Sequence, residues 1–335
     1  MTMSSIGDLA YHLMLRSRST MLSQNLSQLT EELASGRVAD VNEHLGGDIS
    51  HLLDINRDLT RLDGFDTAIV EAGGIADAMQ ASLSLVQSTG EDLAAALIKI
   101  STGNLNASGT AVTEQAYLGL DTVISALNTT VAGRSLYGGV ATDRAPMRTA
   151  QTLLDALEAQ IAPSASASEI RAAAEAWFDD PDGFHAIVYT GADQSRNPVQ
   201  IGAREQVNLS LRADDDIFRN AMLDLSMVAF AGREDLALSS DVRASLRHDA
   251  MGSLLAGTDA LTGLRAELGY AQTRIEDTAA RNAAARASLD MARATMIEAD
   301  PYDTALQLEE AQFQLESLYT VTARNSRLSL LSYLE

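Results

Sequence analysis

The sequence contains no cysteine, which excludes disulfides, thiolate metal sites and a cysteine nucleophile. Aromatic residues make up only 4% of the chain, so an apolar core has to come mainly from Leu, Ala, Ile, Val and Met, which favour helix-on-helix packing. Only five prolines occur among 335 residues, in agreement with long helices. With 46% hydrophobic residues the chain can bury a sizeable core, and its length allows two domains or one elongated molecule.

Positive charge is also scarce, with 24 basic residues against 46 acidic ones and a formal net charge of −22. This balance repels phosphate backbones and anionic lipid surfaces, so we expect no nucleic-acid partner. No apolar run approaches the ~20 residues of a transmembrane helix. Residues 1–14 lack the basic, apolar and small-residue regions of a Sec signal peptide. We therefore expect no membrane insertion and no cleaved signal.

Motifs that carry enzyme chemistry are missing as well. There is no phosphate-binding loop, dinucleotide-binding glycine pattern or Gly-x-Ser-x-Gly elbow, and the histidines lack metal-binding helical spacing. The acidic residues 179–183 and 214–216 are interpreted as turns, the latter as a solvated turn because no histidine or lysine is adjacent in sequence. Trp177 is interpreted as a core residue. We therefore predict no catalytic, cofactor or metal-binding residues.

Leucines at alternating spacings of three and four residues mark a helix at each end of the chain. Gly36 is suited to a left-handed cap that ends the first helix, while Asp300 and Pro301 are suited to begin the last one. The first helix is only marginally stable alone and needs a partner. We predict that these leucines pack the terminal helices within the chain, between subunits, or both: Leu15, Leu22, Leu26, Leu29, Leu33, Leu308, Leu315, Leu318, Leu328, Leu331 and Leu334.

The intervening sequence predicts further helices and an insertion. One helix is expected to run through Leu120 to Val131, and heptad spacing from Leu261 to Met296 is typical of a coiled coil. Between them, helices are expected at 149–161 and 169–178 and strands at 186–190 and 207–211. The fold class is thus mainly α: an elongated helical rod formed by residues 1–134 and 234–335, with a smaller inserted α+β domain at 135–233.

Four segments resemble the flagellin family, in which N- and C-terminal helices pair and a variable domain is inserted between them. Residues 27–37 are similar to the family's N-terminal stretch, where a leucine-spaced helix closes on a Ser-Gly-basic turn. The closer similarity is to the hook-associated branch, and it is carried by Tyr137-Gly138-Gly139 with Ala145-Pro146, by residues 189–201 with 216–218, and by the end Leu328-Ser329-Leu330-Leu331-Ser332-Tyr333-Leu334.

The resemblance implies a mechanical role in the bacterial flagellum rather than an enzyme. Members of that branch form a ring at the distal end of the hook, between the first hook-associated protein and the flagellin filament. They are exported through the flagellar type III channel, after an export chaperone has bound the C-terminal helix. A flagellin filament subunit is the nearest alternative; a hydrolase carried on the inserted domain and a cytoplasmic coiled-coil adaptor are the others.

Overall fold

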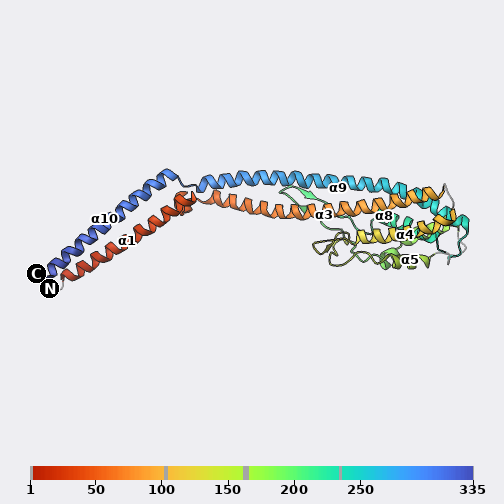
Figure 1. Ribbon diagram of the computed structural model, residues 1–335, viewed down its shortest axis with the longest axis horizontal. Coiled ribbons are helices and arrows are strands. Elements are labelled where there is room, and N and C mark those ends of the chain that lie inside the picture. Colours follow the sequence, from red (N-terminus) through yellow and green to blue (C-terminus); the bar gives the residue numbers. More distant parts are fainter. Residues whose placement is uncertain (1–2, 102–104, 161–165, 234–235, 335) are drawn as a thin grey trace. The chain divides into compact units, whose positions relative to one another are not determined.

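The computed structural model describes residues 3–101, 105–160, 166–233 and 236–334, with side chains except at 3–9, 105–108 and 325–334. This part of the chain forms ten helices and two small antiparallel hairpins (Figure 1). The prediction of a mainly helical fold with few strands is confirmed. The chain divides into two compact units, residues 1–61 with 284–335 and residues 62–283.

The first unit brings the two ends of the chain together. It contains α1 (Met3–Ser35), α2 (Val41–His44) and α10 (Pro301–Leu334), with the start of α3 (Ser50–Ser101) and the end of α9 (Ser240–Ile297). Helices α1 and α10 lie side by side (Figure 1). The N–H of Gly36, whose φ is +69°, donates to the carbonyl of Glu32 at 2.8 Å. An Asp300 carboxylate oxygen accepts from the N–H of Tyr302 at 2.8 Å, so both predicted helix ends are confirmed.

The interruptions before α10 and after α1 are joined by backbone hydrogen bonds. The N–H of Val38 donates to the carbonyl of Ile297, and the N–H of Ala299 donates to the carbonyl of Gly36, each at 3.0 Å. Arg37 and Glu298 form the antiparallel bridge between them. These bonds satisfy backbone groups that the two helix ends leave unpaired.

A continuous hydrophobic core runs through the second unit. Helices α4 (Leu105–Leu127), α5 (Ala150–Glu158), α6 (Ala167–Asp179), α7 (Phe184–Ile187) and α8 (Asp216–Ala231) contribute to it together with α3 and α9. Buried side chains such as Met79, Leu120 and Phe218 belong to the same cluster. The insertion therefore shares its core with the long helices, and the boundaries 135 and 233 stay a prediction.

The helices expected inside the insertion are present, with shifted ends. Thr149 caps α5, and Ser166 with Glu169 forms a capping box at α6. The predicted end at residue 161 lies outside the described residues. Trp177 makes edge-to-face contacts with Phe178 and Phe184 at centroid distances of 5.2 and 6.2 Å. Its side chain is buried, which confirms the expected core role.

The expected strands are mostly wrong. Residues 184–187 form a helical turn, and only Tyr189 pairs with Met147 where a strand over 186–190 was expected. The stacking of Phe184 on Phe178, at a centroid distance of 5.0 Å, stabilises the turn instead. Strand β4 (Gln206–Val207) pairs with β3 (Val199–Gln200) and stops short of the predicted residue 211.

The helix predicted through Val131 ends earlier, at Leu127. Strands β1 (Thr130–Val131) and β2 (Arg134–Ser135) form a hairpin whose two turn residues, Ala132 and Gly133, both have positive φ. This is the geometry of a two-residue type I′ turn, which fits the twist of paired strands. The turn chemistry therefore prevails over the apolar spacing.

Candidate functional site

The leucines of the two predicted stripes differ in burial within the single chain. Leu22 and Leu29 are buried in the α1–α10 pair, whereas Leu33 is 40% exposed. The side chains of Leu328, Leu331 and Leu334 lie outside the described residues. Five members are half-buried: Leu15, Leu26, Leu308, Leu315 and Leu318. The chain's own pairing thus leaves part of the stripe accessible, and its use between subunits stays a prediction.

A second set of apolar side chains on the same helices is exposed. Phe313 on α10 is 70% exposed, although a phenylalanine is normally among the more buried residues. Exposed large apolar groups that gather on one surface make that surface a candidate for contact with another protein. The set comprises Tyr11, Leu13, Met14 and Met21 on α1, and Tyr302, Leu306, Phe313, Tyr319 and Val321 on α10.

A groove of about 370 Å³ connects the seam with this exposed set. Leu22 and Leu318 line it from the seam, and Phe313 and Val321 line it from the exposed surface. Arg18 lies at the same groove. A partner's apolar side chain inserted here would contact both sets at once. We therefore define the assembly surface as this groove with the exposed apolar residues of α1 and α10.

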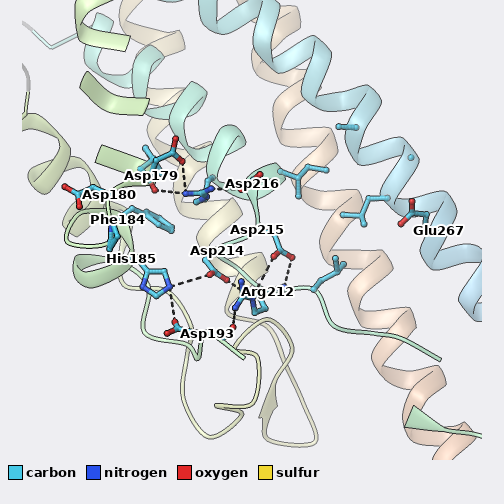
Figure 2. A pocket seen from close by; sticks show the side chains of 18 residues that line it. Asp179, Asp180, Phe184, His185, Asp193, Arg212, Asp214, Asp215, Asp216 and Glu267 are labelled. Carbon is cyan, nitrogen blue, oxygen red and sulfur yellow. Dashed lines mark hydrogen bonds and ion pairs between the residues drawn. The ribbon is translucent and has the colours of Figure 1, made fainter. Parts of the chain in front are cut away.

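A cavity of about 960 Å³ lies in the second unit (Figure 2). The end of α6, α7, the loop before α8, the start of α8 and one face of α9 supply its walls. Two arginines and one histidine face a larger number of acidic side chains: Asp179, Asp180, Asp193, Asp214, Asp215, Asp216 and Glu267.

Asp214 lies at the centre of this charge network, and its side chain is only 8% exposed. The Nε2 atom of His185 is 3.5 Å from one oxygen, and the Nε atom of Arg212 is 3.2 Å from the other (Figure 2). His185 also lies 3.2 Å from Asp193. The predicted turn is present at residues 213–215, but the expectation that it is solvated is wrong at Asp214. Because His185 is distant in sequence, no local pattern signals this arrangement.

The remaining charges of the cavity are also mostly paired. Arg219 binds Asp179 at 3.0 Å and also binds Asp216. Burial raises the pKa of the Asp215 carboxyl, and burial together with the nearby charge of Asp214 raises the pKa of Tyr189. The pairing ties the ends of α6 and α8 together, which is a structural use of these side chains.

The residues that line the cavity include no serine, threonine, cysteine or lysine. The side chains next to His185 are the carboxylates of Asp193 and Asp214 and the ring of Tyr189. Within the part of the chain that the structure describes, no group of three or more His, Cys, Asp or Glu could hold a metal ion. The helices described there also include none that is long and apolar enough to cross a membrane.

Together these features define a mainly helical protein whose two ends pair and expose an apolar surface. Residues 255–334 match the family model of the bacterial flagellin C-terminal helical region. This segment covers most of α9 and all of α10, and its match confirms the resemblance to the flagellin family that was drawn from the sequence. Proteins of this family are structural components of the flagellum. No curated protein sequence matches the chain.

Two solved structures share the fold. One is described as a candidate flagellar hook-associated protein from Vibrio parahaemolyticus; it is 11% identical, with a TM-score of 0.54 over 73% of this chain and 95% of that chain. The other is FlgL from Bacillus cereus, also 11% identical, with a TM-score of 0.53 over 72% of this chain and 100% of that one. At this identity the likeness shows the fold alone.

Proposed function

We propose that the chain joins the hook of the bacterial flagellum to the flagellin filament and has no enzymatic activity. The observation that carries this proposal is the assembly surface: it lies on the pair formed by α1 and α10, and α10 falls within the segment that matches the flagellin family. The shared fold with two hook-associated structures supports the choice of the junction within that family.

In this proposal, copies of the chain form a ring through their terminal helices. One side of the ring contacts the first hook-associated protein and the other contacts flagellin. Each copy would bury the groove at Leu22 and Phe313 and the exposed apolar residues of α1 and α10 against its neighbours. The removal of apolar surface from water at the contact between two proteins is the main driving force of most protein association.

The same surface requires protection before assembly. Export through the flagellar type III channel, without a cleaved signal, would deliver the chain to the distal end of the hook. Until then, exposed side chains such as Phe313 and Tyr319 favour non-specific association. A cytoplasmic chaperone that covers α10 would prevent this, which agrees with the family's use of an export chaperone on the C-terminal helix.

A flagellin filament subunit is the second candidate, because the family match at residues 255–334 applies to flagellin itself. Immunogold labelling of detached flagella distinguishes the two. A junction protein gives label confined to the boundary between hook and filament, whereas a filament subunit gives label along the whole filament.

Deletion of the gene provides the functional test. Loss of the junction should leave hooks intact, remove filaments and release unpolymerised flagellin into the medium. A plasmid-borne copy should restore the filaments. Hooks that still carry normal filaments in the deletion strain would contradict the proposal, as would flagella that lack the protein altogether.

A further inference from the structure

A separate cavity of about 220 Å³ lies among α3, α8 and α9 in the second unit. Gly257 of α9 lies in the same helical stripe as the buried Leu254 and Leu261, three and four residues away, where a large apolar side chain is expected. A Cβ atom at Gly257 would meet no other atom within 4 Å. Glycine is also a poor helix former, so it is not there to stabilise α9. The missing side chain at Gly257 is therefore what leaves room for the cavity.

One wall of this cavity carries a buried carboxylate. Asp224 of α8 is the only Asp, Glu, His, Lys or Arg among the buried residues that the structure describes, and its side chain is 3% exposed. Arg171 of α6 places a guanidinium nitrogen 3.1 Å from Asp224 Oδ1, but that oxygen receives no hydrogen bond of good geometry. The same guanidinium also binds Glu175 at 2.8 Å and Ser253 at 3.2 Å.

The charge of Asp224 is incompletely compensated. Arg171 and Ser253 lower the pKa of Asp224 and Glu175 raises it, yet burial has the largest effect and the pKa rises to about 6. A buried charge whose partner is shared in this way gains from a further hydrogen-bond donor. The cavity provides the room for that donor, because it is about seven times the volume of one water molecule in the liquid.

We propose that this cavity binds a primary ammonium group on a short alkyl chain, with the carboxylate of Asp224 as its acceptor. The carboxylate selects a cationic donor and repels anions. Leu225, Leu254 and Leu261 supply apolar walls for the alkyl part, while exposed Asn220 lines the cavity beside them. The ammonium can come from a free amine or from a lysine of another protein. A second copy is a poor source, since Lys99 is the chain's one lysine.

The test uses the full-length protein and n-butylammonium as the probe, with n-butanol as a neutral probe of the same shape. Melting temperature and calorimetry are measured at pH 7.5. Butylammonium should raise the melting temperature in a saturable way, and butanol should not. Asp224→Asn should weaken butylammonium binding at least tenfold. In the unaltered protein, binding should weaken towards tenfold per pH unit below about pH 6, as Asp224 becomes protonated.

A matched pair of glycine variants locates the site. Gly257→Leu fills the cavity and should abolish the response, whereas Gly252→Leu, on the exposed face of α9, should retain it. Both changes replace glycine by a better helix former, so neither is expected to unfold the chain. A response that persists in Gly257→Leu, equal binding of butanol, or no saturable response at all would overturn the proposal.

The two sources are distinguished with a short peptide, acetyl-Ala-Lys-Ala-amide. Binding of this peptide, with the same loss in Gly257→Leu, assigns the cavity to a lysine side chain of another protein. Binding of butylammonium without the peptide assigns it to a free amine. Both results support the ammonium site, and neither depends on the junction function proposed above.

Discussion

The groove on the α1–α10 pair allows a direct comparison of two neighbouring side chains with different roles. Leu22 is 8% exposed and packs within the chain, whereas Phe313 is 70% exposed, yet both line the groove. Truncation of Leu22 to alanine should therefore act on the stability of the single chain. Truncation of Phe313 should act on what the groove contacts. Gln307→Ala, at another exposed position of α10, is the control.

The magnitudes follow from the exposed fractions. Complete burial of a phenylalanine stabilises a fold by about 1.5–3 kcal/mol. Because Phe313 is 70% exposed in the single chain, less than a third of its side chain is buried there. Phe313→Ala should therefore lower the free energy of unfolding by only about 0.5–1 kcal/mol. The exposed remainder, once covered by a neighbour, contributes about 1–2 kcal/mol per contact. That difference is about 5- to 30-fold in association. Leu22→Ala should lower the free energy of unfolding by about 2–5 kcal/mol.

The assay combines denaturant unfolding of each purified variant with a count of filaments per hook in the corresponding strains, at matched levels of secreted protein. Phe313→Ala should unfold almost like the unaltered protein but leave most hooks without filaments. Gln307→Ala should be normal in both measurements. If secreted Phe313→Ala supports a normal number of filaments, the exposed apolar residues of α10 are not a contact and the reasoning is wrong.

Three further predictions concern the helices and the core. Leu26→Pro and Leu315→Pro each remove a backbone hydrogen bond in the middle of a helix and should destabilise that helix by ~3 kcal/mol or more, which separates α1 from α10. Circular dichroism of the secreted protein measures the loss of helix, and filament counts measure the loss of assembly. Normal filaments would contradict the prediction. Burial raises the pKa of Asp224 from 3.8 to about 6, so the folded state binds the proton more tightly and its stability falls as pH rises between these values. Relative to Asp224→Asn, the unaltered chain should lose about 3 kcal/mol of unfolding free energy between pH 3.5 and pH 7. Parallel pH profiles of the two proteins would refute this. In Gly232→Ala the new Cβ atom would clash with the Thr113 side chain, where α8 packs on α4. The free energy of unfolding, followed by thermal denaturation, should fall by about 1–3 kcal/mol. An unchanged melting temperature would contradict the close packing.

The long helices and their ends could be predicted because local chemistry determines them. Gly36 and Asp300 each act within one turn of the helix they delimit, and the leucine spacing is a property of one helix at a time. The wrong assignments have a different origin. Residues 186–190 have the composition of a strand, but the contacts of Phe184 with Phe178 and Trp177 favour a helical turn, and these contacts depend on the tertiary fold.

The candidate sites divide in the same way. The leucine stripes follow from periodicity, but whether Leu33 or Phe313 is covered depends on neighbours that no sequence pattern specifies. The charge network around Asp214 was missed because His185 approaches it only after folding. Sequence spacing places residues on a helix face and does not indicate which faces meet.

The hydrogen-bonded bridge between residues 36–38 and 297–299 has a consequence for the alignment of the chain ends. A heptad stripe alone allows one helix to slide along the other by seven residues, about 10.5 Å, with leucines still facing leucines. The bonds from Val38 to Ile297 and from Ala299 to Gly36 can form in one alignment only. Because α1 has 33 residues and α10 has 34, counting from this fixed point brings both helices to an end at nearly the same level. The bridge therefore fixes the register of α1 against α10. An insertion of seven residues into α1 alone would keep the heptad spacing of its leucines but displace the tip of that helix by about two turns along α10.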